Sequence, residues 1–187
     1  MPSNMKKYLI TAVTLGLIAA GGALLISGTY MLTKDQIDKN KTASINKGLA
    51  AIYGLDANAL NTSTANLPED QKFDYVINEY YEVKDANDAP IGYAFKTEGS
   101  NSYGKISLIV GFNASYTYKG VAVIENGQSF ASTLNKKYLN PIKDAETIEE
   151  VNEVDVSCGA TYGAKLVRSM VNSATNAAEY LKGTNNG

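Results

Sequence analysis

The sequence of 187 residues contains no histidine and a single cysteine, Cys158. Without histidine, the chain cannot form a Ser-His-Asp triad, a Cys-His nucleophile pair or an imidazole-based metal site. One cysteine excludes an internal disulfide, a cysteine-rich zinc site and a cysteine-ligated iron–sulfur cluster within this chain alone. We therefore predict no metal site, and redox chemistry on this chain would require an organic cofactor.

Dense clusters of basic residues are also missing. The chain has 17 lysine and arginine residues against 19 aspartate and glutamate residues, which gives a formal net charge of −2. No basic patch is dense enough to follow a phosphate backbone, so we predict no nucleic-acid partner. The length and the hydrophobic share of 44% fit one globular domain with a short appendage.

A long uncharged run lies near the N-terminus. Between Lys7 and Lys34 there is no charged residue, and residues 8–32 can cross the hydrocarbon layer of about 30 Å as a helix. A cleaved signal peptide is the alternative, but its apolar region usually spans about 7–15 residues, and no small-x-small cleavage site follows here. We predict a retained anchor in membrane lipid, with residues 1–33 forming a cytoplasmic N-terminus and the transmembrane helix.

The lysines that flank the anchor give a conflicting signal for its orientation. Two lysines precede the run and four follow it: Lys6, Lys7, Lys34, Lys39, Lys41 and Lys47. Counted by the positive-inside rule, they lean against export of the domain that follows. Long domains translocate largely regardless of charge, so this count leaves the topology open.

Residues 34–71 are predicted to form a stalk helix and a surface connection. Apolar residues recur at helical spacing as far as Tyr53, whereas Asn, Thr, Ser and Asp dominate beyond Asp56. Further along, the acidic segment 144–154 is interpreted as a solvated helix face rather than a binding site.

The remaining pattern predicts an α+β fold: an N-terminal transmembrane helix followed by an antiparallel sheet packed with helices. Alternating apolar residues indicate about four strands, within residues 73–83, 91–95, 106–112 and 121–124. An amphipathic helix over residues 162–181 should pack on this sheet. The domain should span residues 72–182, and residues 183–187 should form a tail.

Several tyrosines alternate along the predicted strands. They are interpreted mainly as core residues or cross-strand pairs, although one could stack on a flavin: Tyr80, Tyr81, Tyr93, Tyr103, Tyr116 and Tyr118.

The segment 155–161, Asp-Val-Ser-Cys-Gly-Ala-Thr, stands just before the last predicted helix. Its small residues permit close approach of a ligand, and the positive end of the helix dipole favours an anion such as phosphate. Lys165, one turn into the helix, could add positive charge. The alternative is that Thr161 simply serves as the helix N-cap.

The same segment resembles the flavinylation motif of the FMN-binding domain shared by the Rnf complex G subunit and the Na⁺-NQR C subunit. That motif reads Asp, two variable residues, Ser or Thr, then Gly-Ala-Thr, and Asp155, Gly159, Ala160 and Thr161 match it. The resemblance implies FMN attached covalently through its phosphate to the Thr161 hydroxyl by a separate flavin transferase.

The resemblance covers most of the chain but has departures. Cys158 stands where Ser or Thr is usual; we interpret it as a small filler in the turn rather than a redox-active thiol. Relatives usually carry Glu-Thr-Pro-Gly where this chain has Gln-Ser-Phe-Ala at residues 128–131. Gln128 and Ser129 are therefore kept as candidate polar contacts to the flavin.

The resemblance implies an electron-transfer subunit of a membrane ion-translocating oxidoreductase rather than an enzyme by itself. Its partners would be the other membrane subunits of an Rnf- or Na⁺-NQR-type complex, and its domain would be extracytoplasmic. Two alternatives stay open: a stand-alone extracytoplasmic flavoprotein of another respiratory chain, and a non-redox membrane-anchored binding module.

Overall fold

The computed structural model describes residues 3–57, 60–68, 71–75, 77, 79–85 and 87–185. Contacts within the chain divide it into two units, Met1–Thr42 and Ala43–Gly187. Helix α1, Ser3–Tyr53, begins in the first unit and ends in the second.

The first unit contains the apolar part of α1. It carries the one helix among the described residues that is long and apolar enough to cross a membrane. Its large apolar side chains are exposed, with Leu24 at 74% and Leu32 at 85%, so they need an apolar environment that the protein itself does not supply. The hydroxyls of Thr11, Thr14 and Thr29 donate to carbonyls one turn back at 3.0, 2.9 and 2.8 Å. Such bonds satisfy the hydroxyl groups within the helix itself, as a membrane-spanning helix requires.

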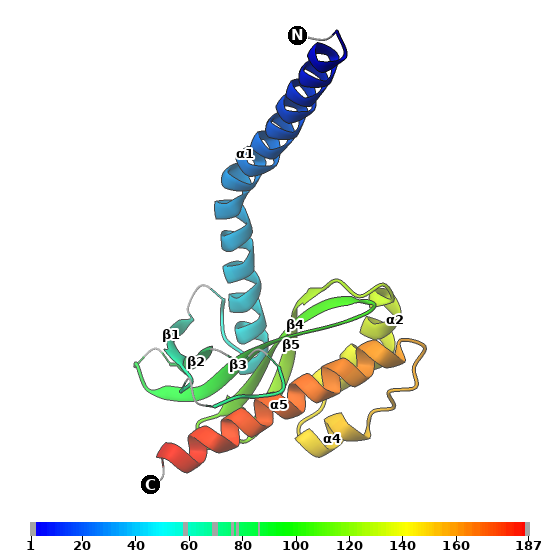
Figure 1. The fold of residues 1–187 in the computed structure, drawn as a ribbon. Helices are drawn as coiled ribbons and strands as arrows, with labels where there is room; N and C mark the ends of the chain where they lie inside the picture. The colour runs from blue at the N-terminus through cyan, green and yellow to red at the C-terminus, as the bar shows by residue number, and fades with distance from the viewer. Residues whose placement is uncertain are drawn as a thin grey trace. The chain divides into compact units, whose positions relative to one another are not determined.

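The second unit is built on a five-stranded antiparallel sheet in the order β1-β2-β3-β4-β5 (Figure 1). Its strands are β1 Asn61–Asn66, β2 Glu79–Lys84, β3 Pro90–Asn101, β4 Gly104–Asn113 and β5 Tyr118–Asn126. Each strand pairs with its neighbour in sequence. For β2 to β5 this is expected, because short turns connect the strands. The predicted α+β class is confirmed.

Two details of the predicted sheet are wrong. β1 lies inside the segment interpreted as a surface connection, so the sheet has five strands rather than four. Its sequence is polar because it is an edge strand that pairs with β2 alone. Phe73, Tyr75 and Ile77 alternate like a strand but lie outside the strands, and they pack on the core from an irregular segment.

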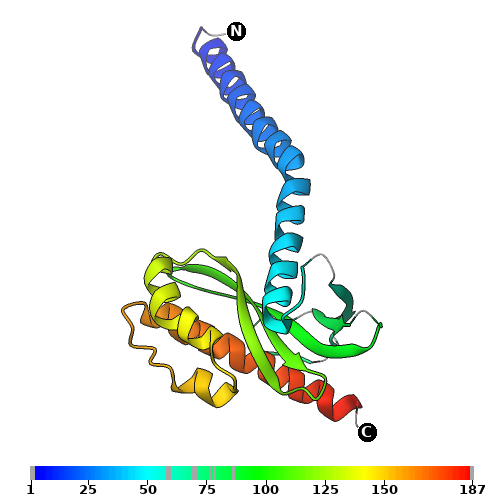
Figure 2. The ribbon, with the colours of Figure 1, turned by 180° about the vertical axis from the view of Figure 1, so that it is seen from behind.

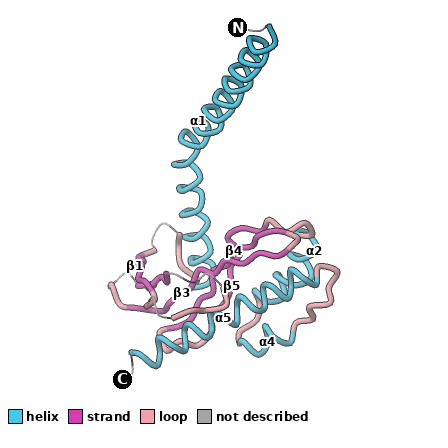
Figure 3. The backbone as a smooth tube through the Cα atoms, in the orientation of Figure 1, coloured by secondary structure: helices cyan, strands magenta, loops and turns pink. Residues whose placement is uncertain are grey.

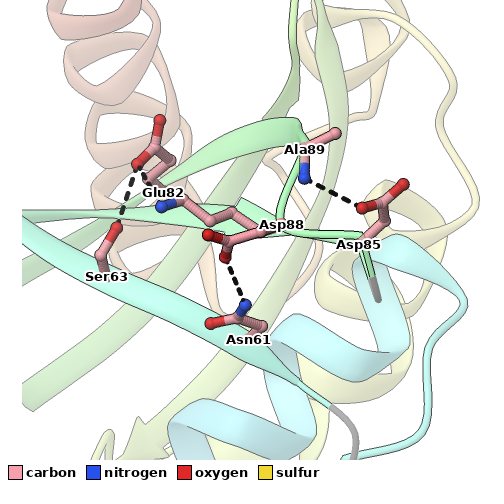
Figure 4. A network of polar contacts seen from close by, with 7 residues as sticks. Asn61, Ser63, Glu82, Asp85, Asp88 and Ala89 are labelled. Atoms are coloured by element: carbon pink, nitrogen blue, oxygen red, sulfur yellow. Dashed lines mark hydrogen bonds and ion pairs between the residues drawn. The ribbon is translucent and has the colours of Figure 1, made fainter.

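Polar contacts fix this edge and the β2–β3 turn (Figure 4). Ser63 donates to a carboxylate oxygen of Glu82 at 3.0 Å, and the Asn61 side chain donates to Asp88 at 2.8 Å. Asp85 Oδ1 accepts the backbone N–H of Ala89 at 3.0 Å, which closes the predicted turn. At this edge, hydrogen bonds between side chains and between backbones therefore hold the strands together, in place of buried apolar side chains.

Helix α5, Thr161–Asn185, covers one face of the sheet (Figure 2). The predicted amphipathic stripe is confirmed, because its members are all buried in the main core: Leu166, Val167, Met170, Val171, Ala174, Ala178 and Leu181. They meet alternate residues of β3 and β4, among them Phe95, Leu108 and Val110. Burial of each large side chain contributes roughly 1.5–3 kcal/mol, so this contact is a major source of the stability of the domain.

The last turns of α1, which belong to the second unit, pack on the opposite face. Leu49 and Tyr53 form a smaller core with Ala94 and Ile109. The Tyr53 hydroxyl shares its one proton between the carbonyls of Tyr93 at 2.7 Å and Phe112 at 2.9 Å. Glycine is required beneath it, because a Cβ on Gly92 would lie 2.6 Å from the Tyr53 ring.

Short helical segments connect β5 to α5 (Figure 3). They are α2 Ala131–Leu134, the π-helix η1 Asn135–Leu139, α3 Asn140–Lys143 and α4 Ile148–Glu153. α4 buries Val151, whereas Glu149, Glu150 and Glu153 are exposed, so the prediction of a solvated acidic face is confirmed. Within the described residues, no group of acidic or cysteine side chains could hold a metal ion.

Candidate functional site

The loop between α4 and α5 is shaped by local hydrogen bonds. Asp155 Oδ1 accepts the backbone N–H of Ser157 at 2.8 Å, which makes an Asx turn. The Arg168 guanidinium reaches back from α5 to donate to the carbonyl of Val154. Gly159 has φ +84°, a left-handed conformation that glycine adopts without strain. These features position Ala160 and Thr161 at the start of α5.

Thr161 is the first residue of α5, and its side chain does not cap the helix. The first helical bond runs from the N–H of Ala164 to the carbonyl of Ala160 at 2.9 Å. Because the N-cap residue is the one whose carbonyl accepts the first bond, Ala160 holds that position. Within the described part of the chain, the Thr161 hydroxyl makes no hydrogen bond. The interpretation of Thr161 as a simple N-cap is therefore not supported.

A pocket of about 220 Å³ opens beside this helix start. It is formed by the β3–β4 turn, the loop after β5, α2 and the first residues of α5, and α2 lies beside the start of α5 in Figures 1 and 2. Its lining residues are Tyr103, Gln128, Phe130, Leu134, Gly159, Ala160, Thr161, Tyr162 and Gly163. Four of the predicted site residues, Gln128, Gly159, Ala160 and Thr161, therefore meet in one place.

The other four predicted site residues do not line this pocket. Asp155 shapes the loop, as described above, and Cys158 is half-buried against the main core. The Ser129 hydroxyl donates a hydrogen bond to the carbonyl of Tyr103 at 3.1 Å, so it helps to position a residue that lines the pocket. Lys165 is exposed, one turn into α5.

Gln128 joins the two sides of the pocket. It is buried, with 6% of its surface exposed, and its side-chain nitrogen donates to the carbonyl of Gly104. A Cβ added at Gly163 would lie 3.3 Å from its Oε1, so the other end of the amide faces the start of α5. The side chain therefore ties the β3–β4 turn to the loop that carries Phe130.

Three aromatic residues of the pocket were not among the predicted site residues, although Tyr103 was one of the six tyrosines of which one could stack on a flavin. Tyr103, Phe130 and Tyr162 are 38, 52 and 65% exposed, and beyond α1 they are the exposed large apolar side chains of the described residues. The rings of Tyr103 and Tyr162 stack with centroids 5.5 Å apart, and the ring of Phe130 lies 5.9 Å from that of Tyr103.

The prediction that Tyr103 belongs to the core or to a cross-strand pair is wrong, because the residue lies in the tight turn between β3 and β4. The sequence signal that could have indicated its role in a binding site was the presence of an aromatic residue in a turn. All three residues line the same pocket as Thr161.

The fold and this site define a membrane-helix-bearing α+β protein with an aromatic-walled pocket at the N-terminus of its last helix. Residues 1–52 match the family model for the RnfG N-terminal region. The chain is 32% identical over 119 residues to the G subunit of the ion-translocating oxidoreductase complex from Haemophilus influenzae strain PittEE, and 31% identical over the same length to that of strain 86-028NP. These matches support the RnfG family and confirm the resemblance to Rnf complex G subunits.

The alignments cover 63% of this chain and 56% of each relative, so the chain spans about half the length of the curated relatives it matches.

Proposed function

We propose that this chain is a membrane-anchored electron carrier that holds FMN through a phosphoester on Thr161 Oγ1. The observation that carries this proposal is Thr161 itself, which lines an aromatic-walled pocket and whose hydroxyl makes no hydrogen bond with the described residues. A hydroxyl that neither caps the helix nor bonds to a neighbour is available for a covalent link.

The residues of the pocket fit the two ends of FMN. The first N–H groups of α5 have no partner within the helix, and together with the helix dipole they favour a phosphate next to Thr161. The exposed rings of Tyr103, Phe130 and Tyr162 offer a surface on which a planar isoalloxazine can stack.

The size of the pocket also suits a carrier. Its volume of about 220 Å³ is below the roughly 300–1,000 Å³ of sites that enclose a small molecule. FMN would therefore remain partly exposed, which allows a redox partner to approach it. When bound, FMN accepts and releases electrons; the chain retains it, orients it and limits its contact with water.

We propose further that the carrier works within an ion-translocating oxidoreductase of the Rnf or Na⁺-NQR type, since the relatives are named as G subunits of such a complex. Its partners would be the other membrane subunits, and a flavin transferase would load it. An anchor in the same membrane raises the effective concentration of the carrier near those subunits.

The C-terminal domain is proposed to lie outside the cytoplasm, as the resemblance to Rnf G subunits implies. The count of lysines after the anchor opposes this orientation, but a domain of this length translocates largely regardless of charge. Protease added to sealed right-side-out cells should degrade the domain. Protection until the cells are lysed would reverse the assignment.

Coexpression of the full chain with a flavin transferase tests the proposed attachment. The wild-type band should fluoresce as a flavin after denaturing electrophoresis, and Thr161→Ala should abolish that signal. The Thr161→Ala variant should fold as well as the wild type, because the hydroxyl makes no hydrogen bond with the described residues. Ser157→Ala, in the same loop, is the matched control and should load normally. A fluorescent Thr161→Ala band would refute the proposed site.

A further inference from the structure

A second pocket, of about 420 Å³, lies on the α1 side of β5. Its walls come from the last turns of α1, from β5 and from the end of α3, all within the second unit. The FMN-binding residues proposed above take no part in it.

Three lysines from three different elements border this pocket: Lys47 of α1, Lys119 of β5 and Lys143 of α3. All three are exposed, and no aspartate or glutamate of the described residues lines the pocket. Within the same part of the chain none of them forms an ion pair, whereas Lys84, on β2, pairs with Glu82 at 3.5 Å. The pocket therefore combines three positive charges with no compensating carboxylate.

The lining between the lysines is largely apolar. Ile52 of α1 and Val123 and Ile124 of β5 contribute to it, and each is half-buried. β5 pairs with β4 alone, so its outer edge has no strand partner in the described part of the sheet. Such an edge can accept a further strand through backbone hydrogen bonds.

Protection of the β5 edge against aggregation does not explain the whole arrangement. A lysine on an edge strand discourages unwanted pairing, and Lys119 alone would serve that purpose. Lys47 and Lys143 come from two helices, and they converge on the pocket with Lys119.

We propose that this pocket binds an acidic, extended segment of a neighbouring subunit, whose carboxylates meet Lys47, Lys119 and Lys143 and whose apolar side chains contact Ile52 and Ile124. The assembly into a membrane complex rests on the proposed function, but the docking surface does not depend on FMN. Charge complementarity of this kind sets the orientation of a partner and the salt sensitivity of the contact.

A triple variant, Lys47→Gln with Lys119→Gln and Lys143→Gln, tests the proposal in the full-length chain. A matched control replaces three exposed lysines outside the pocket, Lys72, Lys136 and Lys182, by glutamine, which changes the net charge equally. Complexes purified in mild detergent are treated with a carbodiimide, which joins a lysine amine to a carboxylate in direct contact, and the cross-links are mapped by mass spectrometry.

We expect Lys47, Lys119 and Lys143 to cross-link to one acidic segment of a neighbouring subunit. Loss of the three charges should reduce retention of that subunit by about tenfold, whereas the control should retain it. Equal retention by both variants, or cross-links confined to other lysines, would overturn the proposal. So would charge-dependent binding to vesicles of anionic phospholipid with no cross-link to a protein, which would make the occupant a lipid headgroup.

Flavin fluorescence of the same preparations separates this inference from the proposed function. A triple variant that carries flavin but loses the partner supports the docking surface. A wild-type chain that cross-links as expected but carries no flavin would refute the FMN proposal and leave the docking surface in place.

Discussion

The hydroxyl of Tyr53 should fasten the end of α1 to the sheet. Its single proton is shared between the carbonyls of Tyr93 at 2.7 Å and Phe112 at 2.9 Å, and the residue is only 9% exposed. Tyr53→Phe keeps the ring but removes the hydroxyl, so the carbonyls of Tyr93 and Phe112 lose this buried hydrogen-bond donor. The loss should lower the free energy of unfolding by about 1–3 kcal/mol.

For a unit of this size, that loss corresponds to a fall in Tm of about 3–10 °C, measurable by circular dichroism in detergent. Tyr180→Phe is the matched control, because its ring packs on the main core and its hydroxyl makes no hydrogen bond with the described residues. The control should melt within about 1 °C of the wild type. If Tyr53→Phe melts together with this control, the two hydrogen bonds do not fasten the helix as argued.

Three further outcomes are expected. Gly159→Ala should lower the free energy of unfolding by about 1–2 kcal/mol in denaturant titrations, because φ +84° strains a residue with a Cβ. In the flavin-loaded chain, Tyr162→Leu should brighten flavin fluorescence by removing a stacked, quenching ring; unchanged brightness would place the isoalloxazine elsewhere. Burial raises the pKa of Tyr93 from 10.0 to about 12. The folded state therefore keeps that proton more tightly, and stability should fall as the pH rises from about 10 through about 12, less steeply in Tyr93→Phe.

Parts of the fold with a strong apolar period could be predicted from the sequence. The candidate membrane helix is a long run without a charged residue. In the last helix, the apolar residues on either side of Leu166 and Met170 repeat at helical spacing. β1 could not be predicted, because its polar residues are held by pairing with β2 and by contacts such as Ser63 to Glu82. Phe73, Tyr75 and Ile77 pack on the core without forming a strand. Periodicity alone cannot distinguish such a segment from a strand.

The candidate site was predictable where the resemblance to a family supplied the residues, which were the segment 155–161 and Gln128. Gly159, Ala160 and Thr161 stand together in the chain and line the pocket. Tyr103 and Phe130 come from two other segments, and only the pairing of β3, β4 and β5 brings them beside α5. The position of the N-cap is likewise a property of backbone hydrogen bonds that the sequence does not specify to a single residue.

The most direct measurement is to locate the flavin on the chain by mass spectrometry of tryptic peptides from the loaded protein. Cleavage after Lys143 and Lys165 releases residues 144–165, a peptide that carries the hydroxyls of Thr147, Ser157, Thr161 and Tyr162. We predict an FMN-sized mass on this peptide, with fragment ions that place it on Thr161 and on none of the other three residues. An FMN mass on another residue, or a fully loaded coexpression system that yields only unmodified peptide, would contradict the account.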